Sequence, residues 1–340
     1  MSELTPARIM QVGMGYWPAR TLQTAASLEL FTKLGKGGMT AEQLRTALKL
    51  APRASPDFFD ALVALKFLER DGDGPGAIYR NSEEAAMFLD SASPAYIGGF
   101  LQMAHDRLYP FWSGLRKALE SGEAQNEATH SGKSLFDELY ADPNRLEQFM
   151  AAMSGVSSGN FALFAGKFDF SNYKTLCDAG GAEGILSMMV ARANPHMTCT
   201  TADLAVVEPI AKRKIAAAGL SDRVHTAAID FLSGPLPRAD VITMGMILHD
   251  WNLPIKQMLI KKAYEALPEG GAFVAIEQLI DDARRENVFG LLMSLNMLIE
   301  TGDGFDFSGA DFAGWCKQAG FRRFDVMPLT GSASAAIAYK

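Results

Sequence analysis

The sequence is poor in cysteine and has no hydrophobic run long enough to cross a membrane. Its cysteines, Cys177, Cys199 and Cys316, are scattered and match no metal-ligand spacing. No apolar stretch reaches the roughly 20 residues that a membrane-spanning helix needs. The first residues lack the basic stretch and hydrophobic core of an export signal. We therefore expect a cytoplasmic protein with reduced cysteines, no metal site and no membrane partner.

Positive charge is scarce as well. The 32 Lys and Arg residues face 39 Asp and Glu residues, which leaves a net charge of −7. Nucleic-acid binding depends on concentrated Lys and Arg, so we expect no nucleic-acid partner. Hydrophobic residues make up 48% of the 340 positions, and this length exceeds one typical domain. We therefore expect more than one domain, each with its own core.

The N-terminal region, residues 1–92, reads as a mainly helical domain. Residues 5–35 have apolar positions on several faces of a predicted helix, which is typical of a core helix or a subunit interface. Two short helices follow, and then the ERDGDG turn of a predicted hairpin. This winged-helix pattern suits DNA binding or dimerisation. Because acidic residues offset the few basic ones, we favour a dimerisation domain and a homodimer.

Residues 167–340 alternate predicted strands and helices. Such alternation predicts an α/β fold, a Rossmann-like doubly wound parallel sheet with helices on both faces. The last segment, FRRFDVMPLTGSASAAIAYK, predicts an antiparallel β-hairpin added to the sheet edge. Between the two domains, residues 93–166 read as linking helices rich in Met and aromatic side chains.

The motif LCDAGGAEG points to a nucleoside ligand. A buried strand ends near Asp178, and Gly180, Gly181 and Gly184 let the chain turn tightly against a ligand. Asp203 ends the next strand about 20 residues later, where an acidic side chain can bind both hydroxyls of a ribose. The residues leave two ligand classes open, a dinucleotide or S-adenosylmethionine. Asp178 would repel a phosphate and suits the ammonium and sulfonium of S-adenosylmethionine.

A second motif, ILHDW, places His249 at the end of a predicted strand, beside the expected ligand crevice. Glu277, at the end of the next strand, and Asp306, in a later loop, are the acids that can reach it. Carboxylates that hold an imidazole fix its tautomer and stabilise its charged form, as a general base requires. A histidine satisfied only by local hydrogen bonds is the alternative.

At these motifs the chain resembles the O-methyltransferases of the plant caffeate and hydroxyindole type and their bacterial small-molecule relatives. The resemblance covers nearly the whole chain. It implies that His249 is the base, steadied by Glu277 and Asp306, and that no metal takes part. It also implies a cofactor site for S-adenosylmethionine, which leaves as S-adenosylhomocysteine. That site comprises Asp178, Gly180, Gly181, Gly184, Asp203, Leu204, Asp230, Phe231 and Trp251. Two positions depart from the family pattern, Ala182 in the glycine motif and Gly245 in place of a lysine.

The acceptor is expected to be a small aromatic or apolar molecule with a hydroxyl group. A phenol has a pKa near ~10 and a free histidine about 6.5, so histidine suits a phenol or enol better than an aliphatic alcohol. We expect a largely apolar pocket formed by Phe100, Met103, Trp112, Phe149, Met153, Phe289, Met293 and Met297. The main alternative is a C- or N-methyltransferase on the same scaffold. A nicotinamide oxidoreductase and a nucleoside-sensing regulator are the others.

Overall fold

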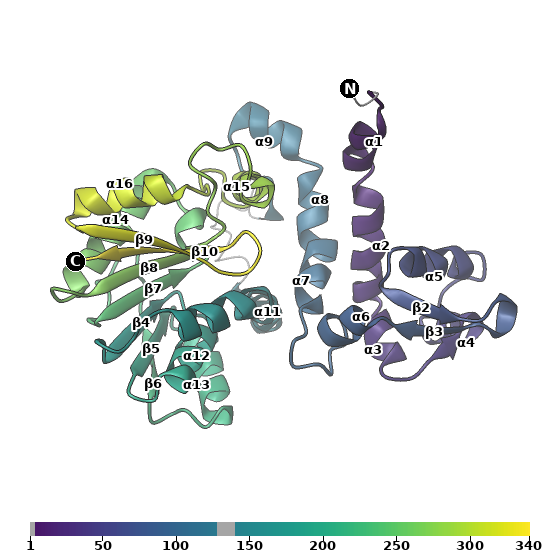
Figure 1. The fold of residues 1–340 in the computed structure, drawn as a ribbon, viewed down its shortest axis with the longest axis horizontal. Coiled ribbons are helices and arrows are strands. Elements are labelled where there is room, and N and C mark those ends of the chain that lie inside the picture. The colour runs from purple at the N-terminus through teal and green to yellow at the C-terminus, as the bar shows by residue number, and fades with distance from the viewer. Residues whose placement is uncertain (1–3, 128–139) are drawn as a thin grey trace. The chain divides into compact units, whose positions relative to one another are not determined.

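The computed structural model describes residues 4–127 and 140–340, which divide into two compact units, Met1–Pro110 and Phe111–Lys340 (Figure 1). The expected linking region, residues 93–166, falls across both units, and its residues 128–139 lie outside the described part. Helix α8 (Tyr109–Trp112) runs across the division. Within the described residues, no helix is long and apolar enough to span a membrane.

The first unit is mainly helical and contains the predicted hairpin. Its strands β2 (Leu68–Asp71) and β3 (Ile78–Asn81) pair antiparallel, and β1 (Met39–Thr40) pairs with the other side of β3. Its other elements are α1 (Ala7–Gly13), α2 (Tyr16–Ser27), α3 (Leu30–Leu34), α4 (Ala41–Ala47), α5 (Ser55–Ala64), η1 (Gly74–Gly76), α6 (Glu83–Phe88), α7 (Gly98–Met103) and the π-helical turn η2 (Ala104–Leu108).

The helix expected over residues 5–35 is divided into three. Glu29 has φ of 56°, a left-handed conformation that interrupts the α-helix between α2 and α3. Leu30 and Phe31 of α3 are buried in the core of this unit. By contrast, Ile9 and Val12 of α1 are 75% and 74% exposed. The apolar N-terminal segment therefore presents an uncovered hydrophobic face within its unit.

The second unit confirms the predicted α/β fold. Its seven-stranded sheet has the order β6-β5-β4-β7-β8-β10-β9. The five strands β6, β5, β4, β7 and β8 pair parallel, and β10 runs antiparallel to both β8 and β9. The strands are β4 (Thr175–Ala179), β5 (Thr198–Asp203), β6 (Val224–Ala228), β7 (Val241–Gly245), β8 (Ala272–Glu277), β9 (Arg323–Pro328) and β10 (Ser334–Tyr339).

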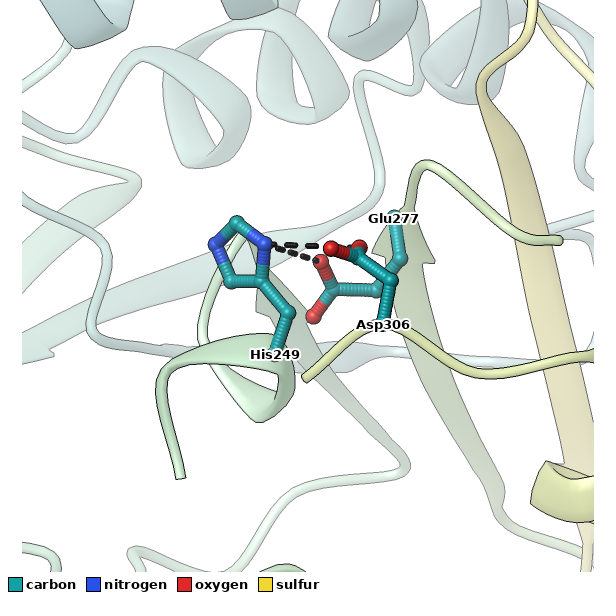
Figure 2. Close-up of side chains that lie close together, drawn as sticks. All are labelled: His249, Glu277 and Asp306. Carbon is teal, nitrogen blue, oxygen red and sulfur yellow. Dashed lines mark ion pairs between the residues drawn. The ribbon is translucent and has the colours of Figure 1, made fainter. Parts of the chain in front are cut away.

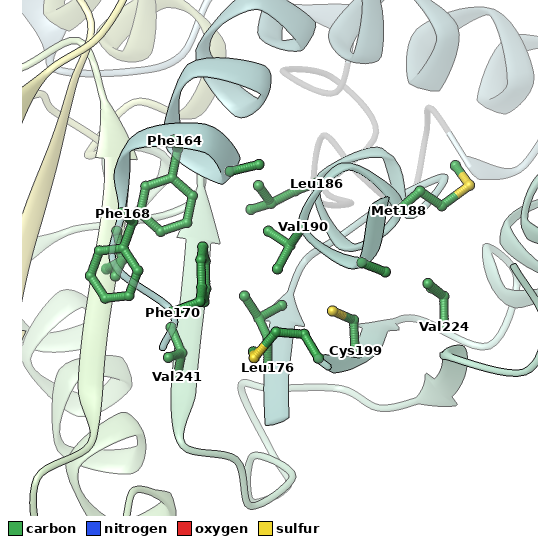
Figure 3. Close-up of a cluster of buried hydrophobic side chains, with 14 of the residues drawn as sticks. Phe164, Phe168, Phe170, Leu176, Leu186, Met188, Val190, Cys199, Val224 and Val241 are labelled. Carbon is green, nitrogen blue, oxygen red and sulfur yellow. The ribbon is translucent and has the colours of Figure 1, made fainter. Parts of the chain in front are cut away.

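Helices cover both faces of this sheet, because alternate strand residues point to opposite sides. Leu176 of β4 packs in one core with residues of α11 and α12, which Figure 3 shows. Its neighbour Cys177 packs in the other core with residues of α14 and α16. The helices are α9 (Leu115–Ser121), α11 (Pro143–Lys167), α12 (Ile185–Ala193), α13 (Glu208–Ala217), η4 (Leu248–Asp250), α14 (Leu253–Ala266), α15 (Val288–Thr301) and α16 (Gly309–Ala319).

Candidate active site

The predicted functional residues gather where the parallel strands end. Strand β5 ends at Asp203 and β8 ends at Glu277. The glycine motif follows β4, and η4 with His249 follows β7. Carboxyl ends of parallel strands share one edge of the sheet, which is where ligands bind in this kind of fold. One edge of the second unit therefore carries both predicted motifs.

The glycine motif needs its glycines at two positions. Gly180 has φ of +75°, which few residues other than glycine adopt. A Cβ on Gly181 would lie 2.3 Å from Thr201 Oγ1 and 2.7 Å from Asp178 Oδ2, closer than atoms can pack. Ala182, where the family usually has glycine, has φ of 47° and so adopts a strained conformation. The glycines thus let this loop pack closely against strands β4 and β5.

Asp203 ties that loop to strand β5. Its Oδ2 accepts a hydrogen bond of 2.9 Å from the backbone N–H of Ala182, and its Oδ1 accepts one of 2.7 Å from Leu204. Burial raises the pKa of Asp203, and these two backbone bonds oppose the rise. The carboxylate keeps further lone pairs that a ribose can use.

Asp178 is buried beneath the loop rather than open to it. Its Oδ1 accepts a hydrogen bond of 2.7 Å from Thr243 Oγ1 on the neighbouring strand β7. Burial raises the pKa of Asp178 to about 7, although the bond from Thr243 opposes the rise. Thr243 was not predicted, because nothing local in the sequence indicates that Thr243 and Asp178 face each other across β4 and β7.

The aromatic residues expected beside the adenine lie together. The rings of Phe231 and Trp251 meet edge to face with 6.3 Å between their centroids. Phe231 also lies near the glycine loop, 3.6 Å from where a Cβ on Gly180 would be. Asp230 is exposed and binds its own turn, accepting hydrogen bonds from the Leu232 N–H and the Ser233 hydroxyl.

The fold brings His249, Glu277 and Asp306 together, as Figure 2 shows. Nδ1 of His249 lies 3.5 Å from Asp306 Oδ1 and 3.9 Å from Glu277 Oε2. All three side chains are buried. Glu277 is held in place because its Oε1 accepts hydrogen bonds from the backbone N–H groups of Ile247 and Leu248. The carboxylates therefore face one nitrogen of the imidazole.

The position of His249 within its element differs from the prediction. Strand β7 ends at Gly245, and Met246 has φ of 56°, so the chain leaves the sheet at that point. His249 then lies in the short 3-10 turn η4, and Nε2 of its ring is 3.5 Å from Asp250 Oδ1. The turn, rather than the strand, directs the imidazole towards Glu277 and Asp306.

The electrostatics of this cluster favour the charged imidazole. Burial alone lowers the pKa of His249, but Glu277, Asp250 and Asp306 more than offset it and raise the pKa to about 10. Burial raises the pKa of Glu277 to about 7, and His249 opposes the rise. The cluster thus stabilises an imidazolium, which is the form a base reaches after accepting a proton.

The residues expected at the acceptor pocket fall in both units. Phe100 and Met103 are half-buried on α7 of the first unit. In the second unit, Trp112 donates a hydrogen bond of 2.8 Å to Asn296 on α15. Phe149, Met153 and Met293 are half-buried, Met297 is buried, and Phe289 is half-exposed. Their part in binding an acceptor stays a prediction.

Two further residues of the site were not predicted. Tyr140, just before α11, packs its ring 6.4 Å from that of Phe149. Burial and the nearby carboxylates of Asp203 and Asp250 raise the pKa of Tyr140 above its ordinary value. Lys256 of α14 is fully buried close to the histidine cluster. A sequence pattern identifies neither, because each owes its place to contacts with distant segments.

Gly245 stands where the resemblance leads one to expect a lysine, and its surroundings explain the change. A Cβ at this position would lie 2.9 Å from the ring of Phe161 on α11. The aromatic ring therefore occupies the space of a side chain at position 245.

Comparison with known proteins identifies the family. A protein-family model described as an O-methyltransferase domain matches residues 112–322. A second family model, described as an O-methyltransferase dimerisation domain, matches residues 10–91. The chain therefore belongs to the O-methyltransferase family, and it is an enzyme that uses S-adenosylmethionine.

Relatives and solved structures agree with this assignment. Tetracenomycin polyketide synthesis 8-O-methyl transferase TcmO of Streptomyces glaucescens is 37% identical over 335 residues, 98% of this chain and 97% of the relative. N,N-dimethyltransferase OxyT of Streptomyces rimosus is 37% identical over 314 residues, 92% of this chain and 90% of the relative. Human N-acetylserotonin methyltransferase in complex with S-adenosylmethionine has a TM-score of 0.90 at 27% identity, and the match covers 100% of this chain and 99% of that one.

Proposed function

We propose that the enzyme methylates a phenolic or enolic hydroxyl of a small aromatic molecule of the polyketide kind, with His249 as general base. The observation that carries the proposal is the buried His249, whose Nδ1 faces Glu277 and Asp306 at the ligand edge of the sheet. Incubation with labelled S-adenosylmethionine and a panel of aromatic hydroxy compounds tests it. An O-methylated product, identified by mass spectrometry, is the expected result.

The residues present fit S-adenosylmethionine. The loop packs closely on strands β4 and β5 at Gly181, and Asp203 stands at the end of β5 with lone pairs for a ribose. Leu204, Asp230 and the aromatic pair of Phe231 and Trp251 complete the proposed site, and Asp178 supports the loop from beneath. When bound, the sulfonium supplies an already activated methyl group, so the chain needs no nucleophile of its own.

His249 has the task of taking the proton from the acceptor hydroxyl. With Nδ1 turned towards Glu277 and Asp306, Nε2 is the nitrogen that accepts it. In the free protein the carboxylates keep the imidazole protonated near neutral pH. His249 accepts the proton in its neutral form, and Glu277 and Asp306 stabilise the imidazolium that results. A positioned base of this kind contributes about 10²–10⁴-fold to the rate.

Positioning supplies the remainder. The acceptor oxygen must be held in line with the methyl group, and such alignment can lower the barrier by up to about 7–11 kcal/mol. We propose that Trp112, Phe149 and Met153, together with Phe289, Met293 and Met297 of helix α15, form the apolar walls of that pocket.

N-methylation is a second candidate, because OxyT, named an N,N-dimethyltransferase, has the same 37% identity to this chain as TcmO, over 314 residues. An amine that is neutral at the assay pH needs no base. Loss of His249 would then leave turnover intact, which separates the two candidates. A cytoplasmic location is also proposed, supported by cysteines that are buried and free of disulfides.

We expect the enzyme to be a homodimer built on residues 1–92. This expectation rests on the exposed apolar face of α1 and α2, on which Ile9, Val12 and Trp17 are at least 59% exposed. Light scattering is expected to give twice the chain mass at micromolar concentration. Changing Ile9 and Val12 together to Glu should raise the dimer dissociation constant at least about tenfold, since burying unpaired charge costs more than about 1.4 kcal/mol.

Val326→Glu is the matched control for that experiment, because it places a charge at another exposed apolar side chain, on β9 of the second unit. It is expected to stay dimeric. A wild-type protein that remains monomeric would show that this apolar face has another role.

Turnover is expected to be independent of divalent metal. His249, Glu277 and Asp306 lie close enough to hold a metal ion, but we assign the acids to the imidazolium. Dialysis against EDTA should leave kcat within about twofold of its starting value, because an activated methyl donor needs no Lewis acid. A loss of activity that Zn²⁺ or Mg²⁺ restores would contradict this assignment, and elemental analysis of the protein provides the control.

A further inference from the structure

Lys256 is a lysine with no exposed surface, one turn into α14 and beside the histidine cluster. Its Nζ donates a hydrogen bond to the backbone carbonyl of Trp251 and lies 3.6 Å from the centre of the Phe305 ring. Burying an ammonium group is costly unless opposite charges or an aromatic face compensate for it. Its position therefore calls for an explanation beyond packing.

The contacts of Lys256 join two segments that carry the proposed catalytic pair. Residues 302–307, which include Asp306, lie directly against the turn of His249. A Cβ on Gly304 would be 2.6 Å from the carbonyl oxygen of Asp250 and 2.7 Å from that of His249. Lys256 binds both sides of this junction, the turn through Trp251 and the segment through Phe305.

The charges around Lys256 are those of the catalytic cluster. It is faced by Asp250 of η4, Glu277 of β8, and Asp303 and Asp306 of the segment 302–307. Burial lowers the pKa of Lys256 to about 8, and these four carboxylates oppose the drop, so the group is charged at neutral pH. Lys256 in turn lowers the pKa of Asp250, which burial raises to about 6. The ammonium thus helps to keep Asp250 ionised.

We propose that Lys256 is a positioning residue for the base, an ammonium clamp that holds Asp306 against His249. The inference rests on the proposed function, since a clamp matters to turnover only if His249 takes the proton. Without the clamp, the segment 302–307 separates from η4, Asp306 moves away from Nδ1, and the imidazolium loses part of its stabilisation.

Turnover of four variants tests this role. Lys256→Met keeps the length of the side chain and removes its charge, and we expect it to lower kcat about tenfold. Asp306→Asn is expected to lower kcat similarly, and the double variant should lose no more than either single one. Lys261→Met, an exposed position on the same helix, is the matched control and should retain wild-type turnover.

A purely structural lysine predicts a different pattern. The fold-decreases in kcat caused by Lys256→Met and Asp306→Asn would then multiply in the double variant, and this result would overturn the proposal. A Lys256→Met enzyme with the turnover of Lys261→Met would overturn it as well. If Asp306→Asn alone keeps wild-type kcat, the proposed base mechanism fails instead, and hydrogen exchange then tests the clamp separately.

Hydrogen exchange gives that readout without activity. In Lys256→Met, amides of residues 249–252 and 302–307 should exchange at least about tenfold faster, while those of the sheet stay unchanged. Phe305→Leu removes the ring beside Lys256 Nζ, together with its edge-to-face contact with Trp315, but keeps the ammonium. It should show a smaller change at the same amides, even if Lys256→Met proves unstable. Unchanged exchange at residues 302–307 in both variants would overturn the clamp.

Discussion

Replacing His249 with alanine is expected to lower kcat by about 10²–10⁴-fold, the usual contribution of a positioned general base. The affinity for S-adenosylmethionine should change little, because the glycine loop and Asp203 are separate from the imidazole. Glu277→Gln should cause a smaller loss. It keeps the shape of the side chain and the acceptor for the Leu248 N–H, but removes the charge that stabilises the imidazolium.

The thermal stability of these variants separates catalysis from structure. The folded-state pKa of His249, about 10, lies above its unfolded value of 6.5, so this group stabilises the fold fully below pH 6.5. That contribution is lost as the pH rises from 6.5 through 10, and His249→Ala should show less of this decline. A His249→Ala enzyme with reduced melting temperature but normal turnover per folded molecule would mean that the histidine is only structural.

Asp203→Ala is expected to raise the dissociation constant for S-adenosylmethionine by roughly ten- to a hundredfold, as measured by calorimetry. Hydrogen bonds to charged groups are worth about 1.5–3 kcal/mol, and the variant loses the proposed ribose contact. It also loses the bond from the Ala182 N–H, which holds the glycine loop to β5. Both losses act on the cofactor rather than on the acceptor.

Asp203→Asn provides the control, since its amide oxygen still accepts one hydrogen bond. Its dissociation constant should lie between those of the wild type and Asp203→Ala. Unchanged affinity in Asp203→Ala would show that the ribose binds elsewhere. A fall in kcat at saturating cofactor without a change in affinity would contradict the assignment equally.

Much of the fold and the candidate site could be predicted because the relevant signals are local. Alternating strands and helices predicted parallel pairing of the strands, and strand ends placed Asp203 and Glu277 at one edge. The C-terminal hairpin followed from two apolar runs around a turn of small residues, and β9 and β10 pair as expected. Asp306 was placed through the family resemblance, and in the structure it lies beside His249 as expected.

Other features depend on backbone conformation or on contacts between distant segments. The exit of the chain from β7 at Met246 and the break at Glu29 both require positive φ at residues where glycine is absent, so no sequence signal marks them. The bond from Thr243 to Asp178 depends on strand register. The burial of Lys256 depends on Phe305, some 50 residues away along the chain. Such features arise from packing, which residue patterns do not encode locally.

The most direct test of the central claim compares kcat of the wild type and His249→Ala on a series of phenols whose own pKa values span the assay pH. O-methylated product is confirmed by mass spectrometry for each phenol. If His249 takes the hydroxyl proton, the ratio of the two kcat values should be about 10²–10⁴ for weakly acidic phenols and approach one for phenols already ionised. A ratio that stays constant across the series, or a methyl group found on carbon or nitrogen, would contradict the account.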